Sequence, residues 1–321
     1  MHVWARTTRR SFICGKDDLL GRDYEHRRGW FKDRIEKLAD IYCIDVITYS
    51  IMHNHHHELL RTRADIVKTL SNEEAVRRWM KLDYDRYFFP DGSDRKSTKA
   101  NVKKRAADPK QMKKIRRTLS NVSKFMQSLN QHIAVRANKE GGGAGKFFEQ
   151  RFGHEVLADT PEVLACNLFI DLNPIHAQIA NTPEESEYTG AYERINDLRM
   201  HLVEEEGRLT LNLSQSGSEV HQWERLGEGS SGWLSPLEID ERTDPAGPDV
   251  ATNDKRASNK GAIPMSLMAY LELLEEAENG WGRGLLAGVE GYFPMSFVEI
   301  ESDAAAAAAG YTACTELRNI D

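Results

Sequence analysis

Apolar and polar residues alternate in a way that predicts two adjacent strands early in the chain. Residues 44–52 form an apolar run rich in β-branched side chains, which is typical of a strand. His53 and Asn54 then indicate a tight turn, because asparagine tolerates left-handed backbone, and a second strand returns over 55–61. Residues two apart on a strand share a face. We therefore expect His55 and His57 to point the same way, close enough together to hold one divalent cation.

Apolar residues three and four apart predict helices elsewhere. Ser71 followed by Glu74 is the pattern of a capped helix start, and Thr160 with Pro161 is another. Pro174 should end the second of these near Asn173. The expected helices cover 30–41, 71–82, one long amphipathic span over 112–133, 160–173, and a segment that begins at Thr182.

The remaining chain predicts less regular structure. An edge strand is expected over 3–13 and a further strand over 146–157. Glycine, serine, proline and acidic residues dominate 214–260, which is typical of a loosely structured linker. Residues 264–278 regain a regular pattern.

Composition places the chain among soluble globular proteins. It has 321 residues, 40% of them hydrophobic and 29% charged, and no stretch reaches the ~20 apolar residues of a membrane span. Its four cysteines form no CxxC pair, and its start has no apolar signal core. These features favour a reducing, cytoplasmic setting and argue against a zinc knuckle.

The net charge of −7 hides a strong asymmetry. Residues 95–146 carry fifteen lysines and arginines against two acidic residues, whereas the chain after residue 200 is strongly acidic. A basic block inside an acidic protein indicates a polyanionic partner, most simply nucleic acid. A solvated helix face is the alternative interpretation.

Two histidines need further donors to hold a metal, and the helix that ends at Pro174 offers the oxygen of Asn173. Phe169 lies one turn earlier on the same helical face. The alternative for such a histidine pair is a solvated turn with no ligand.

Four segments together resemble a known family. Residues 52–60 read MHNHHHELL, residues 145–152 read GKFFEQRF, residues 169–177 read FIDLNPIHA, and residues 183–189 read PEESEYT. Their order and spacing resemble those of HUH transposases of the single-tyrosine class, in the REP-associated branch. The resemblance covers about residues 2–200.

The resemblance implies an α+β fold, a ferredoxin-like antiparallel sheet with helices on one face. A basic helical insertion would occupy about 62–140, and an acidic accessory region would follow over 201–321. It also implies DNA transposition, in which Mg²⁺ or Mn²⁺ polarises a phosphate of single-stranded hairpin DNA and a tyrosine attacks it. By motif position the metal ligands would be His55, His57 and Asn173. The resemblance allows a homodimer as well as a monomer.

Phe169 stands where the family has its nucleophilic tyrosine, and phenylalanine has no oxygen with which to attack. Three interpretations follow. The chain has lost strand cleavage and is a DNA-binding relic or a domesticated regulator; a nearby tyrosine substitutes; or metal-activated water hydrolyses the strand. The candidate substitutes are Tyr188, Tyr192, Tyr84 and Tyr87.

His56 also departs from the family, which usually has an apolar residue there. We expect Glu58, on the same face, to pair with it.

Basic side chains near the motifs are the expected DNA contacts, because phosphate contacts position a nucleic acid without reading its sequence. Trp4 and Phe148 are candidates for stacking on unpaired bases, and each is equally compatible with a core position. The expected phosphate contacts are Arg6, Arg9, Arg10, Lys113, Lys114, Arg116, Arg117, Lys146 and Arg151.

A second, local resemblance lies in the acidic region. Residues 267–300 look like the second half of an SH3 domain, whose ligand would be a proline-rich peptide. Half of a small barrel cannot close its sheet, so a degenerate or coincidental match is the alternative. A metalloprotein unrelated to DNA is the remaining competing function for the whole chain.

Overall fold

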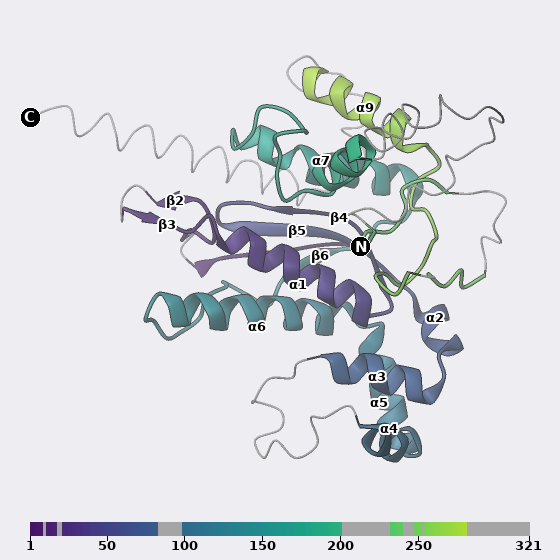
Figure 1. Cartoon of the computed structure of the whole chain (residues 1–321). Helices are drawn as coiled ribbons and strands as arrows, with labels where there is room; N and C mark the ends of the chain where they lie inside the picture. Colours follow the sequence, from purple (N-terminus) through teal and green to yellow (C-terminus); the bar gives the residue numbers. More distant parts are fainter. Residues whose placement is uncertain are drawn as a thin grey trace, which may run out of the picture.

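The protein is an α+β structure built around one four-stranded antiparallel sheet (Figure 1). The computed structural model describes residues 1–8, 11–17, 21–82, 98–200, 232–239, 247–251 and 253–280. The strand order is β4-β5-β1-β6, and two short strands pair separately. The strands are β1 (His2–Arg6), β2 (Lys16–Asp17), β3 (Arg22–Asp23), β4 (Ile44–Ile51), β5 (His55–Thr62) and β6 (Gly153–Glu155).

Helices cover both faces of the sheet, so the expectation of helices on one face is wrong. Figure 1 shows α1 (Arg27–Ile41) and α6 (Val122–Glu140) on one side, with α7 (Thr160–His176) and α9 (Leu267–Gly280) on the other. The reason lies in β4 and the first part of β5, where residues of both parities are buried. A strand that buries both faces needs a helical layer on each.

The two strands expected around the histidines are confirmed. β4 and β5 pair in antiparallel register around the turn at His53 and Asn54, and the Met52 N–H donates to the His55 carbonyl at 2.9 Å. The first strand is shorter than expected and is not at an edge. β1 ends at Arg6 and lies between β5 and β6, because β6 supplies a partner that the sequence shows only weakly.

The expected single helix over 112–133 is in fact two. α5 (Pro109–Leu119) ends before Ser120, and α6 begins after Asn121. The Asn121 side chain accepts a hydrogen bond from the Lys124 N–H at 3.0 Å, which is an N-cap that starts a new helix. The apolar spacing continues across the break and conceals it.

Helix starts elsewhere were predicted with mixed success. Ser71 caps α3 (Asn72–Lys81) by accepting from the Glu74 N–H at 3.1 Å, as expected. The α7 cap is Asp159 rather than Thr160, and α7 continues through Pro174 because its buried face holds it against the sheet. The segment from Thr182 forms turns, and the next helix covers 190–200. Of the strand expected over 146–157, only β6 and an isolated bridge between Phe148 and Thr7 form.

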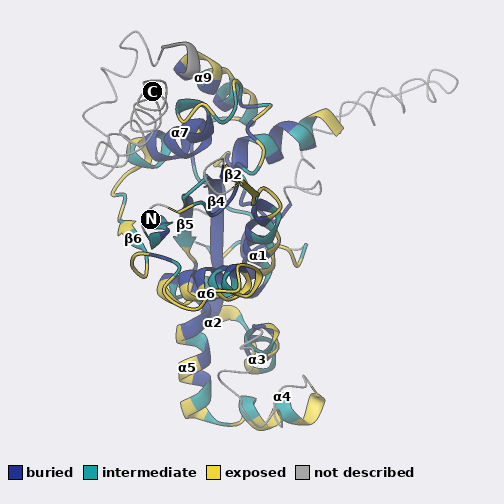
Figure 2. Ribbon diagram, turned by 90° about the vertical axis from the view of Figure 1, so that its left-hand side faces the viewer, coloured by how far each residue is buried: buried dark blue, intermediate teal, exposed yellow. Residues whose placement is uncertain are grey.

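The basic insertion forms a separate helical layer. α4 (Lys99–Ala106) and α5 pack with α3, and α2 (Ala64–Thr69) packs with α5. Figure 2 shows this layer at the bottom of the molecule, beyond α6, with its outer surface exposed. Among the described residues, no helix has the length and apolar character that crossing a bilayer requires.

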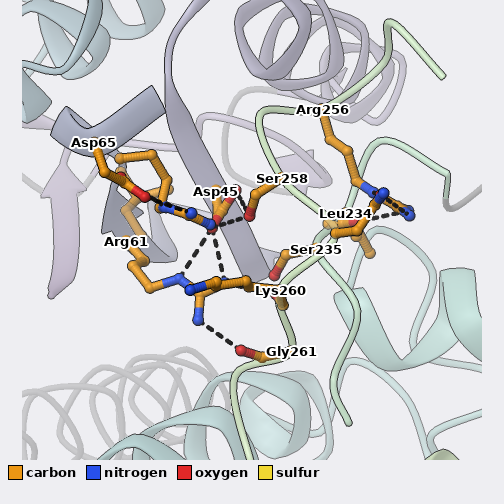
Figure 3. A network of polar contacts seen from close by, with 12 residues as sticks. Asp45, Arg61, Asp65, Leu234, Ser235, Arg256, Ser258, Lys260 and Gly261 are labelled. Carbon is orange, nitrogen blue, oxygen red and sulfur yellow. Dashed lines mark hydrogen bonds and ion pairs between the residues drawn. The ribbon is translucent and has the colours of Figure 1, made fainter. Parts of the chain in front are cut away.

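The acidic region packs against the domain where it is described, so the expectation of a loose linker is wrong for 232–239, 247–251 and 253–260. Trp233 is fully buried, and Figure 3 shows the main polar attachment. The Ser258 hydroxyl lies 2.8 Å from both carboxylate oxygens of Asp45 on β4, and Arg61 on β5 donates to the carbonyls of Lys260 and Gly261 at 2.6 Å. Asp45 also accepts from Arg61 at 2.8 Å.

α9 confirms regular structure over most of 264–278. A helix there does not match the strand that an SH3 domain would need, and the rest of the SH3-like segment, 281–300, lies outside the described residues.

Candidate metal centre

His55 and His57 project from β5 toward α7, as the alternation predicts. Their ring centroids are 4.9 Å apart with perpendicular planes. His55 is 5% exposed and His57 is fully buried. Across the sheet, Arg6 pairs with His55 and Trp4 pairs with His57, so the register of β1 fixes what surrounds the imidazoles on this face.

Each of the two imidazoles has one nitrogen engaged and the other without a partner. The Nδ1 of His55 lies 2.6 Å from the Asn54 carboxamide oxygen; because that oxygen only accepts, the ring proton is on Nδ1. The Nδ1 of His57 is hydrogen-bonded to Nε2 of His2 at 2.9 Å. The Nε2 atoms of His55 and His57 are buried with no hydrogen-bond partner. The His57–His2 hydrogen bond is compatible with a proton on Nδ1 of His57, and in that tautomer both Nε2 atoms present lone pairs to the site.

Burial keeps these rings neutral. Desolvation, with a smaller contribution from the nearby Arg6, lowers the pKa of His55 to about 3. The pKa of His57 is lowered well below its usual value, first by desolvation and then by His55 and His2. A neutral imidazole with an exposed lone pair is the form that binds a metal.

His2 is a site residue that the sequence did not reveal. Its ring stacks on His57 with centroids 5.1 Å apart, and burial lowers its pKa to about 3. The hydrogen bond to Nδ1 of His57 orients that ring, as outer partners of metal-binding histidines commonly do. In the sequence, the alternation of His2, Trp4 and Arg6 indicates only that these residues share one face of a strand. It does not show that this face lies beside His57, because that depends on the pairing of β1 with β5.

Phe169 lies against the imidazoles, as its motif position implies. Its ring meets His57 edge-on at 5.7 Å and lies 6.3 Å from His2, and the residue is 1% exposed. Asn173 follows one turn later on α7 and is 8% exposed. In the part of the chain that is described, no hydrogen bond joins its carboxamide to either imidazole.

The donor set fits a metal in part. The described residues contain no group of three histidine, cysteine or acidic side chains that could hold an ion. If the two unpartnered Nε2 atoms bind an ion, its other coordination positions must be filled by oxygen donors. The candidate among the protein's side chains is the carboxamide oxygen of Asn173. Two imidazoles suit a transition ion, so Mn²⁺ fits this set better than Mg²⁺.

Asp171 fixes α7 to the sheet beside this site. Its buried carboxylate accepts from the Thr48 hydroxyl of β4 at 2.5 Å, the Tyr270 hydroxyl of α9 at 2.6 Å and the Ala191 N–H at 3.1 Å. Burial raises the pKa of this carboxyl. The acidic region thus contributes directly to holding the helix that carries Phe169, which its composition gave no reason to expect.

Of the candidate substitute tyrosines, the two that are described, Tyr188 and Tyr192, make no ring contact or hydrogen bond with His55 or His57. Tyr188 has a left-handed backbone with φ 65° and packs on the α1 side of the sheet, opposite His55 and His57. Tyr192 is partly buried at the start of the 190–200 helix. Tyr84 and Tyr87 lie outside the described residues.

The expected DNA contacts divide into two groups. Arg6 lies beside the histidines, and Lys146 and Arg151 are exposed on the segment that runs along β1, where Thr8 donates to the Lys146 carbonyl at 3.1 Å. The α5 residues lie in the helical layer beyond α6, far from this face (Figure 2). Those exposed on α5 are Lys113, Lys114 and Arg117.

Arg116 has a structural role instead. Its guanidinium donates to the carbonyls of Val67 and Leu70 and to the Asn72 side chain, so it ties α5 to α2 and to the start of α3. Arg9 and Arg10 lie outside the described residues.

His56 and Glu58 face α1 and α6, and their expected pairing is confirmed. The Nδ1 of His56 lies 2.6 Å from the Glu58 carboxylate, and Nε2 lies 3.0 Å from the Asn130 carboxamide oxygen. The Asn130 amide donates to the Arg151 carbonyl at 2.9 Å, which fixes its oxygen toward the ring. Both ring nitrogens of His56 therefore have a hydrogen-bond partner on this side of the sheet.

Comparisons with protein-family models, with curated proteins and with solved structures give no match to this chain.

Proposed function

We propose that this chain is a transposase-like DNA-binding protein of the HUH, REP-associated type, which holds single-stranded hairpin DNA at a divalent metal bound by His55 and His57. The observation that carries the proposal is the pair of buried, unpartnered Nε2 atoms on neutral rings 4.9 Å apart. A buried polar atom without a partner costs free energy, and a shared cation would remove that cost for both rings. A bound Mn²⁺ would supply a positive charge that attracts and polarises a phosphate.

The chain's own residues favour binding over tyrosine-linked strand transfer. Phe169 occupies the nucleophile position and has no hydroxyl, and Tyr188 packs on the other side of the sheet. Arg6, which lies beside His55, adds a cation at the site. The proposed activity is therefore metal-dependent capture of a single strand without covalent linkage, as in a non-cleaving regulator derived from a transposase.

The test is binding and cleavage of a fluorescent hairpin oligonucleotide by the wild-type protein and by Phe169→Tyr, with Mn²⁺, Mg²⁺ or EDTA. We expect Mn²⁺-dependent binding by both proteins and a denaturation-resistant adduct only with Phe169→Tyr. Phe169→Leu is the matched control, because it also replaces the side chain at position 169 but supplies no hydroxyl.

A covalent adduct on the wild-type protein would refute the non-cleaving function. Binding that is indifferent to both metal and strand type would refute the proposal as a whole. Metal binding with no DNA binding would favour a metalloprotein unrelated to DNA.

A further inference from the structure

Trp4 occupies a distinctive position next to the imidazole pair. It is the cross-strand partner of His57 on one side and of Gly153 on the other. Its indole leans over Gly153, so closely that a Cβ at that position would collide with the ring atoms Cε2, Cζ2 and Nε1. Gly153 therefore makes the space in which the indole lies across β6.

This indole remains partly exposed, whereas the other candidate for stacking is not. Phe148 is 6% exposed and packs against His56 and Phe147 on the α1 side of the sheet. Of the two aromatic residues that the sequence singled out, only Trp4 lies on the face of His55 and His57.

The residues around Trp4 differ in charge from one end of β1 to the other. His2, Trp4 and Arg6 alternate along β1 and share the α7 face. The His2 ring lies 4.9 Å from the indole at an interplanar angle of 30°. Glu155 pairs with His2 at one end of β1, and Arg6 lies opposite His55 at the other. The surface thus runs from an acidic end, across an aromatic ring, to a basic end beside the imidazoles.

We propose that Trp4 is a stacking platform for an unpaired base of the strand held at His55 and His57, an inference that rests on the proposed function. A base offers a π-face to the indole whatever its identity, and a neighbouring cation favours the adjoining phosphate. Arg6 is the group that contacts this phosphate. Gly153 serves as a positioning residue, because it lets the indole lie in the plane that a base can cover.

The experiment measures the affinity of wild type, Trp4→Ala, Trp4→Phe and Gly153→Ala for a fluorescent hairpin oligonucleotide with a single-stranded flank, in Mn²⁺. We expect Trp4→Ala to weaken binding by about 5- to 150-fold, the range found for loss of one base–aromatic stack. Trp4→Phe should retain part of the affinity, and Gly153→Ala should lose part of it. Trp30→Ala is the matched control, since Trp30 lies on α1 and packs on the opposite side of the sheet.

A scan with abasic nucleotides identifies the stacked base. One position in the flank should weaken wild-type binding when it is abasic, and the same change should have no further effect on Trp4→Ala. Mn²⁺ affinity measured without DNA shows that the imidazole pair is intact in each variant. A crosslinking experiment on wild type needs no variant: 5-iodouracil at the identified position should crosslink to a peptide containing Trp4.

The failures are distinguishable. If wild type binds the hairpin in Mn²⁺ but Trp4→Ala binds it equally well and the crosslink maps elsewhere, the platform is refuted and the proposed function stands. If wild type binds no oligonucleotide in any metal, both are refuted.

Discussion

Three consecutive histidines on β5 are almost equally buried and yet have opposite surroundings. His56 faces α1 and α6 and is hydrogen-bonded through both ring nitrogens, to Glu58 and to Asn130. His55 and His57 face α7, and each retains a buried Nε2 with no partner. The hydrogen bonds of the first ring are complete, whereas the other two are neutral rings, each with one nitrogen left without a partner.

The comparison shows what separates a structural histidine from a ligand candidate. Burial alone does not, because all three rings are inside the protein. The separation comes from the partners that the two helical layers supply: α6 supplies Asn130, an oxygen acceptor, whereas α7 presents the apolar edge of Phe169 to His57. A face that buries polar atoms without satisfying them is a face where a ligand is expected.

Breaking the pair of His56 and Glu58 should have the largest effect, and the quantity that changes is the stability of the fold. If the pair of His56 and Glu58 is ionised, His56→Leu leaves the Glu58 carboxylate buried without its cation, and breaking such a pair costs about 3–5 kcal/mol of the free energy of unfolding. Urea denaturation followed by circular dichroism would measure it. The double variant His56→Leu/Glu58→Leu should recover much of the loss, because no buried charge is left alone. A His56→Leu protein as stable as wild type would show that the pair is not ionised.

Removing one imidazole of the pair on the α7 face should change the affinity for metal and not the stability of the fold. His57→Ala removes one of the two nitrogen atoms that are proposed to bind the metal. We expect Mn²⁺ affinity to fall by more than about 100-fold, since loss of an outer hydrogen-bond partner of a ligand already costs about 10- to 100-fold. Isothermal titration with MnCl₂ would measure it. His154→Ala is the control, because His154 is exposed on β6. Equal Mn²⁺ affinity in His57→Ala and wild type would remove the metal centre.

The sequence was sufficient to predict which face each histidine takes and that His56 pairs with Glu58. Alternation on a β-branched run predicts which face each histidine takes, and the link between His56 and Glu58 follows from their shared parity. The local signals of β4, β5 and the Ser71 cap are strong because they depend on near neighbours.

Long-range partners could not be predicted, because they depend on strand register and on segments far apart in the chain. His2 reaches His57 only through the pairing of β1 with β5. Ser258 bonds Asp45 across 213 residues, and Tyr270 bonds Asp171 across 99. A composition typical of a linker gave no indication that the Ser258 hydroxyl is buried against a carboxylate, and the regular pattern around Tyr270 does not show which carboxylate its hydroxyl meets. The end of α5 was missed for a local reason: the Asn121 cap lies within an unbroken apolar stripe.

Neutralising Arg6, which lies on the same face as His55 and His57, should have a moderate effect on the salt dependence of DNA binding. Arg6→Gln removes one phosphate contact next to His55, so the slope of log affinity against log salt should fall by about one. Fluorescence anisotropy of the hairpin at several salt concentrations would measure it. An unchanged slope would exclude Arg6 from the DNA contacts.

The smallest effect should come from the most basic stretch of the chain. Lys113, Lys114 and Arg117 are exposed, but α6 and the sheet separate them from His55 and His57. Changing all three to glutamine should alter affinity for a short single strand by less than about twofold, because exposed charges beyond a Debye length of ~8 Å are largely screened at physiological salt. Anisotropy with a short unpaired strand and with a long hairpin, at the same salt, would measure it. A loss confined to the long hairpin would mean that its duplex arm extends past α6 to the helical layer. An equal loss with both would contradict the placement of the strand on the α7 face.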